Sequence, residues 1–134
     1  MKSKIIIVLA VFTTFLSCKN EAKEETKISE NTVQTDIQLI QFHTEHRCET
    51  CNNIEKLSKE TIKGNEAISF VLYNVDDEKN AKVAEQFEAT GTSLYLYNSK
   101  TKATKDLTEM AFMYAKNEGD KFKTELQKEI SEFK

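Results

Sequence analysis

The stretch that decides the fold is IQLIQFHTEHRCETCNNI, residues 37–54. Its first part, residues 37–42, is rich in branched and aromatic side chains and predicts a β-strand. Cys48 and Cys51 follow, and from Ile54 onward apolar side chains recur at helical spacing with polar residues between them. The stretch therefore predicts a strand, a short connection that carries a C-x-x-C pair, and a helix.

Strand-like and helix-like segments alternate through the rest of the chain. Gly64 is expected to end the first helix, and a strand is predicted at 68–75. The next predicted helix starts with Asp76, Asp77 and Glu78, ends before Gly91, and buries Val83, Ala84 and Phe87. Strands at 93–97 and 101–107 follow, and then a helix near 120–133 with Phe122, Leu126, Ile130 and Phe133 on one face. This β-α-β order favours parallel pairing with a right-handed crossover. A C-x-x-C beside such a unit is typical of the thioredoxin-like motif. We therefore predict an α/β, thioredoxin-like fold for residues 37–134, with a central mixed sheet of about four strands flanked by helices.

The Cys48–Cys51 pair predicts thiol–disulfide chemistry. A bridge across two residues constrains the unfolded chain little, so the spacing disfavours a structural staple. At a helix start the first thiol faces the positive end of the helix dipole, which stabilises a thiolate. We assign Cys48 as the nucleophile that attacks a substrate disulfide and Cys51 as the resolving thiol. Three nearby residues are further candidates: His43 for proton transfer, Arg47 for stabilising the thiolate, and Ser93 for binding a substrate backbone.

Metal binding is the second hypothesis for this segment. The chain has two histidines, His43 and His46, and both lie just before the cysteines. Two imidazoles and two thiolates, from His43, His46, Cys48 and Cys51, suit Cu(I), Cu(II) or Zn(II). Redox chemistry without a cofactor is favoured, and copper or zinc binding is the alternative. A third alternative is an interaction module whose disulfide is inert, so the sequence leaves open whether the chain is an enzyme.

Several short motifs resemble those of one thioredoxin-like family. They are Phe42-His43, Arg47-Cys48-x-x-Cys51, Asn74-Val75-Asp76, Thr90-Gly91, Asp106-Leu107-Thr108 and Ala111-Phe112-Met113-Tyr114-Ala115. In this order they span the domain, and the chain resembles the thioredoxin-like family labelled nitrophenyl compound nitroreductase subunit ArsF. The family name implies a link to nitro-compound reduction. No stretch of the chain resembles a flavin or nicotinamide site.

The chain also departs from ordinary thioredoxins. It contains no tryptophan and no proline, so the cis-proline that faces the cysteines in thioredoxins is missing. Ser93 is predicted to fill that place. The position six residues before Cys48, often a buried acid in thioredoxins, is Phe42. These departures argue against efficient general reductase activity.

A cluster of sulfur and aromatic side chains precedes the last helix. Its members are Met110, Phe112, Met113 and Tyr114. Such residues can bind soft metals or form a docking surface, but methionine and aromatic side chains more often fill gaps in a core. We therefore expect all four to pack inside the domain.

The N-terminus predicts export and lipid attachment. Residues 1–4 are basic, residues 5–16 carry no charge, and Leu16-Ser17-Cys18 follows. The uncharged run is shorter than the roughly 20 residues that span a bilayer, and the layout is that of a secretory signal peptide. Leu-Ser before a cysteine resembles the bacterial lipobox, which implies removal of residues 1–17 and acylation of Cys18 with chains such as palmitate. Lys19 is not the aspartate that holds lipoproteins at the inner membrane, so the outer membrane is favoured.

The remaining composition describes a tethered acidic module. Residues 18–36 are polar and predict a lipid-bearing cysteine followed by a flexible tether. Removal of Lys2 and Lys4 with the signal peptide takes the formal charge from −3 to −5, which argues against nucleic acid as a partner. We therefore predict a protein of the bacterial cell envelope, attached to the membrane through lipid and facing the periplasm or the surface. Its expected partners are exported protein thiols or a redox donor.

Overall fold

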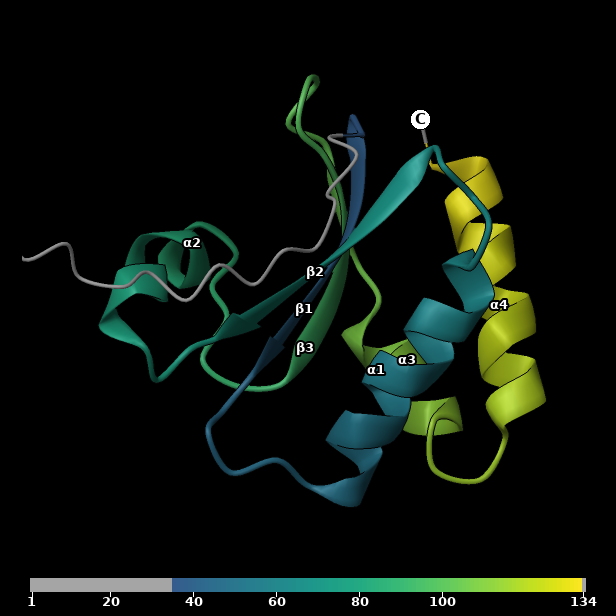
Figure 1. Cartoon of the computed structure of the whole chain (residues 1–134), viewed down its shortest axis with the longest axis horizontal. Coiled ribbons are helices and arrows are strands. Elements are labelled where there is room, and N and C mark those ends of the chain that lie inside the picture. Colours follow the sequence, from purple (N-terminus) through teal and green to yellow (C-terminus); the bar gives the residue numbers. More distant parts are fainter. Residues whose placement is uncertain (1–34, 134) are drawn as a thin grey trace, which may run out of the picture. The chain divides into compact units, whose positions relative to one another are not determined.

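A computed structural model describes residues 35–133, and Figure 1 shows the arrangement of their helices and strands. The elements are β1 (Ile37–His43), α1 (Glu49–Ile62), β2 (Ile68–Asn74), the 3₁₀ turn η1 (Glu78–Asn80), α2 (Ala81–Gln86), β3 (Ser93–Asn98), β4 (Thr104–Asp106), α3 (Thr108–Tyr114) and α4 (Gly119–Glu132). The predicted signal peptide, Cys18 and nearly all of the tether lie outside the described residues. Within 35–133, no helix combines the length and apolarity that crossing a membrane requires.

The four strands form one mixed sheet in the order β2-β1-β3-β4. β1 pairs in parallel with β2, while β3 is antiparallel to both β1 and β4. β1 therefore lies inside the sheet, and its residues Leu39 to Phe42 are buried. The predicted α/β, thioredoxin-like fold is confirmed. The parallel β1-α1-β2 unit also places the cysteine connection at the carboxyl end of a central strand.

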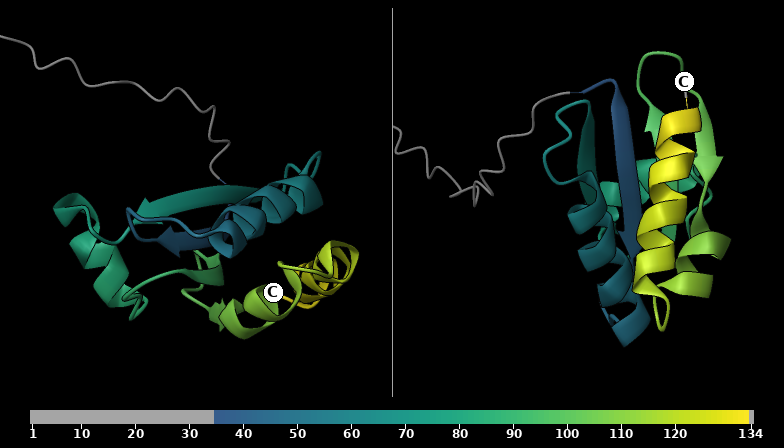
Figure 2. Two further views of the ribbon diagram at one scale, coloured as in Figure 1. Left: turned by 90° about the horizontal axis from the view of Figure 1, so that it is seen from below. Right: turned by 90° about the vertical axis from the view of Figure 1, so that its right-hand side faces the viewer.

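Alternation along β1 divides the core between the two faces of the sheet. Leu39 belongs to a cluster with Ile54 of α1 and Phe122 of α4. Figure 2 shows α1 and α4 side by side over this face, whereas α2 lies on the opposite side of the sheet in Figure 1. Ile40 and Phe42 point to the α2 face. The cysteine-bearing helix and the Phe42 side chain therefore lie on opposite faces.

The helices α1 and α4 agree with their predicted limits. Cys48 caps the N-terminus of α1, and Gly64, with a φ of +82°, follows its C-terminus in the left-handed region that favours glycine. In α4, Phe122 and Leu126 are fully buried. Ile130 packs against the same core from the next turn. The predicted apolar faces are thus the ones that hold these helices to the sheet.

The helix after β2 is shorter than predicted. Its acidic start is a separate turn, η1, in which the Asp77 side chain accepts a hydrogen bond from the Lys79 N–H. α2 then ends at Gln86, well before Gly91, because Glu88 adopts a φ of +52°. The N–H of Ala89 donates to the Ala84 carbonyl at 2.8 Å, which completes a Schellman-type stop. A glutamate therefore takes the place that the sequence assigned to glycine.

β4 and α3 also differ from expectation. The predicted strand at 101–107 shrinks to three residues because Asn98 starts a turn that brings Lys102 to a φ of +65°. The following segment forms α3, a short helix that was not predicted. The expectation of core packing is right for Met110 and Tyr114, which pack against the core. It is wrong for Phe112 and Met113, which are 42% and 56% exposed because they lie on the outer side of α3.

Candidate active site

The site is built where the connection after β1 enters α1. Cys48 is exposed and has an extended backbone, with φ −82° and ψ 168°, as the N-cap residue of α1. Its Sγ accepts a hydrogen bond from the Cys51 N–H at 3.3 Å. The first turn of a helix leaves its N–H groups without intrahelical partners, and this cap supplies one of them with an acceptor, the Cys48 sulfur.

Cys51 lies one turn further along α1 and is only 5% exposed. Its Sγ and the hydroxyl of Thr92 share a hydrogen bond of 3.2 Å. Burial alone would raise the pKa of the Cys51 thiol, but hydrogen bonds from Cys48, Thr92 and the backbone outweigh it and leave the pKa lowered. Both cysteines are free thiols. The pair therefore combines an accessible sulfur with a buried one whose pKa is lowered by its hydrogen bonds.

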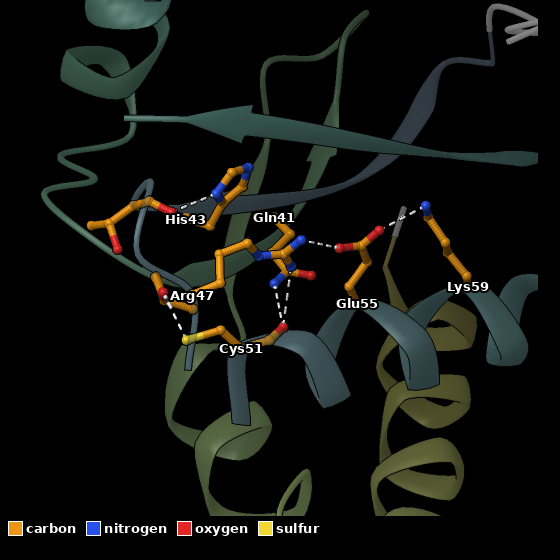
Figure 3. A network of polar contacts seen from close by, with 8 residues as sticks. Gln41, His43, Arg47, Cys51, Glu55 and Lys59 are labelled. Carbon is orange, nitrogen blue, oxygen red and sulfur yellow. Dashed lines mark hydrogen bonds and ion pairs between the residues drawn. The ribbon is translucent and has the colours of Figure 1, made fainter. Parts of the chain in front are cut away.

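Arg47 is held against α1 by an ionic network. One guanidinium nitrogen donates to the carbonyl of Cys51 at 3.4 Å, and another pairs with Glu55 at 2.6 Å. Lys59 pairs with the second oxygen of Glu55 at 2.8 Å (Figure 3). Burial would raise the pKa of Glu55, but the hydrogen bonds and charges of Lys59 and Arg47 prevail and hold it below its usual range. Arg47 thus contacts the backbone of the buried cysteine.

Gln41 is a site residue that sequence reasoning missed. It is fully buried in β1, and its Nε2 donates to the Cys51 carbonyl at 3.0 Å, beside Arg47 (Figure 3). Its Oε1 has no hydrogen-bond partner among the described residues. The sequence comparison with thioredoxins pointed to Phe42, but that ring faces the α2 side. The signal that could have identified Gln41 is a glutamine between the apolar residues Leu39, Ile40 and Phe42 of a central strand.

Within residues 35–133, the other predicted site residues make no hydrogen bond to either thiol. His43 is half-buried, and its Nδ1–H donates to the Thr44 carbonyl at 2.8 Å, while His46 is exposed. Ser93 is buried and its hydroxyl donates to the Gly91 carbonyl at 3.5 Å. Thr92, one residue earlier, is the residue of this loop whose hydroxyl contacts the Cys51 sulfur, and the role of Ser93 in binding a substrate backbone stays a prediction. No cis peptide bond occurs between residues 35 and 133.

The proposed metal ligands are not assembled around a common centre. In the described part of the chain, no three side chains among histidine, cysteine, aspartate and glutamate are arranged to hold a metal ion together. His43, His46, Cys48 and Cys51 would have to move to coordinate one ion. Copper or zinc binding therefore stays a prediction from the sequence.

Comparisons with known proteins add little to this geometry. No family model and no curated protein matches the chain. A solved structure described as "Structure of a malarial protein" is 20% identical, with a TM-score of 0.42, over 59% of this chain and 94% of that one. This similarity is too low to bear on the fold or the function. The resemblance to the ArsF family, carried by short motifs, stays a prediction.

Replacing Glu55 by glutamine should lower stability in a pH-dependent way. Because the folded-state pKa of Glu55 is lowered, its ionic contribution is complete above the unfolded value of about 4.3 and is lost as the pH falls through the lowered value. We expect E55Q to cost about 1–2 kcal/mol near pH 7 and almost nothing in strong acid. Urea unfolding followed by circular dichroism measures this. E85Q, on the exposed surface of α2, is the control; an equal loss in both variants, or a loss that does not change with pH, would contradict the assignment.

Proposed function

We propose that this chain is a thiol–disulfide redox protein that exchanges disulfides with an exported partner through Cys48 and Cys51. The observation that carries the proposal is the asymmetry of the pair. Cys48 is exposed at the helix N-cap, and its sulfur accepts a hydrogen bond from the Cys51 backbone N–H. Cys51 is buried in the same helical turn. An accessible thiol next to a buried resolving thiol is the arrangement that disulfide exchange requires.

In the reducing direction, the Cys48 thiolate attacks one sulfur of a partner disulfide. The partner S–S bond breaks, a mixed disulfide forms with Cys48, and the leaving partner sulfur takes up a proton. Cys51 then loses its proton and attacks the Cys48 sulfur, which releases the second partner thiolate and forms the Cys48–Cys51 disulfide. Two electrons move from the chain to the partner, and two partner thiols result. The same steps run backwards when the oxidised chain oxidises a dithiol.

The surrounding residues hold Cys51 in place for the second step. Gln41 and Arg47 donate to its carbonyl, which fixes the first turn of α1. The Thr92 hydroxyl is within hydrogen-bond distance of the Cys51 sulfur and can donate to the thiolate as it forms. Neither the Gln41 amide nor the Arg47 guanidinium can accept a proton at neutral pH, so neither can act as the base for Cys51. The site therefore differs from one that has a buried carboxylate behind the pair.

A single-turnover reaction tests the proposed function. The reduced chain is mixed with an equimolar peptide that contains one disulfide, and both products are alkylated and weighed by mass spectrometry. We expect one Cys48–Cys51 disulfide for each peptide disulfide that is reduced. The redox proposal would be wrong if the peptide disulfide were lost without formation of the Cys48–Cys51 bond. It would also be wrong if neither the reduced chain with a disulfide peptide nor the oxidised chain with a dithiol peptide reacted.

We further propose that Cys18 anchors the protein to the cell envelope by lipid, with the outer membrane favoured. The support is the basic start, the uncharged run and the Leu16-Ser17-Cys18 sequence. Replacing Cys18 by serine should move nearly all of the protein from the membrane to the soluble fraction of cells that express it. Cell fractionation measures this, with Ser17→Ala as the matched control. Continued membrane association of C18S would contradict the anchor.

A further inference from the structure

A groove between β4, α3 and α4 is not used by the chemistry proposed above. Its volume is about 320 Å³. Carboxylates dominate its polar lining, which comprises Asp106, Glu109, Glu125, Glu129 and one cation, Lys105. Lys105 forms an ion pair with Glu129. The other three carboxylates form no ion pair within residues 35–133, so the groove has an excess of negative charge.

The rest of the lining is apolar. Leu107 is buried at 3% exposure, and Met110 and Tyr114 are half-buried beside it. Met113, 56% exposed, also lines the groove, and Phe112 next to it is 42% exposed. These two are the exposed large hydrophobic residues of the described chain. Flexible methionine side chains adapt readily to a partner surface. A groove with an apolar floor and a carboxylate border favours an apolar ligand that carries positive charge.

The groove starts at the end of the sheet that carries the thiols. β1 ends next to the first residue of β3, because Phe42 pairs with Ser93. β4 runs antiparallel to β3 and ends at the same side, where the Leu107 N–H donates to the Leu94 carbonyl at 2.8 Å. Thr92, which contacts Cys51, lies two residues before Leu94. The groove and the cysteine pair therefore lie toward the same end of the sheet.

We propose that the groove binds a segment of a partner protein in which lysine or arginine side chains alternate with large apolar ones. The apolar side chains would contact Met110, Met113 and Leu107, and the cations would face Glu109 and Glu125. The carboxylates that form no ion pair within residues 35–133 provide the charge complementarity, and they also attract such a segment before contact. The idea that this segment presents a disulfide to Cys48 rests on the proposed function, whereas binding itself does not.

A titration with two model peptides tests this inference. One capped peptide alternates leucine with lysine, the other alternates leucine with glutamate, and neither contains cysteine. Binding to the reduced full domain is followed by backbone amide shifts in two-dimensional NMR spectra. We expect the lysine peptide alone to bind, with shifts at residues of α3, β4 and α4, and its affinity to fall as salt is added. The E109Q/E125Q double variant should bind about tenfold more weakly.

The control is the double variant E78Q/E85Q, which removes two exposed carboxylates from η1 and α2 and should bind like the wild type. Equal binding of both peptides, shifts elsewhere, or no binding would overturn the inference. Shifts of the groove amides with protein concentration alone would also overturn it, since a second copy would then be the occupant. If the chain forms the Cys48–Cys51 disulfide but does not bind the lysine peptide, only the proposal about the groove is wrong. If the chain binds the peptide but never forms the disulfide, only the proposed redox function is wrong.

Discussion

Replacing Cys48 by serine should abolish disulfide exchange, with a loss of more than about 1000-fold, because a hydroxyl at this position cannot act as the attacking thiolate. Cys51 is buried and cannot reach a large partner disulfide in place of Cys48. Replacing Cys51 by serine has a different effect. The exposed Cys48 sulfur should still attack, but the mixed disulfide then has no resolving thiol and should accumulate. Mass spectrometry of a reaction with a disulfide-containing peptide distinguishes these two outcomes.

Thr50, between the cysteines, provides a matched control for this experiment. Thr50→Ser changes the same helical turn without removing sulfur, and should react as the wild type does. If C51S failed to accumulate the mixed disulfide while C48S accumulated it, the roles of the two cysteines would be exchanged. If both variants reacted like the wild type, neither sulfur would take part in the reaction.

Replacing Phe42 by alanine should destabilise the domain by about 3–5 kcal/mol, which is a large part of the stability of a small domain. The ring is fully buried on the α2 face of the sheet. Its centroid lies 5.6 Å from that of Tyr73, 5.5 Å from Phe87 and 5.9 Å from Tyr95. Truncation therefore leaves a cavity among rings that cannot all move in to fill it. Urea unfolding followed by circular dichroism measures the loss.

Phe112→Ala is the control for that prediction, since it removes the same ring from an exposed position on α3. We expect a change within about 0.5 kcal/mol. A small effect of F42A would mean that the α2 face is loosely packed.

The fold could be predicted because its strongest signals are local and periodic. The apolar run before His43 and the helical spacing from Ile54 needed no knowledge of the rest of the chain. Phe122 and Leu126 likewise identified α4. The helices that were not predicted, or whose ends were predicted wrongly, depend on details of the backbone conformation. α2 ends at a left-handed glutamate, Glu88, and α3 is a short helix whose outer side exposes Met113.

The site was harder to predict because contacts across the sheet have no local signature. The C-x-x-C spacing identified both cysteines, and the strand before them placed the pair at the start of α1. The side chain of the neighbouring loop that contacts the Cys51 sulfur is Thr92, one residue before Ser93, the residue that was predicted to bind a substrate backbone. Gln41 was overlooked because counting back from Cys48 does not show which face of β1 a residue occupies.

The central claim, that Cys48 and Cys51 form a reversible redox couple, is tested most directly by an equilibrium redox titration. The purified domain is incubated in buffers that cover a graded range of thiol–disulfide potentials, quenched by alkylation, and weighed. We expect a single two-electron transition between the dithiol and one Cys48–Cys51 disulfide, reached equally from the reduced and the oxidised protein. Absence of that disulfide at every potential would contradict the account.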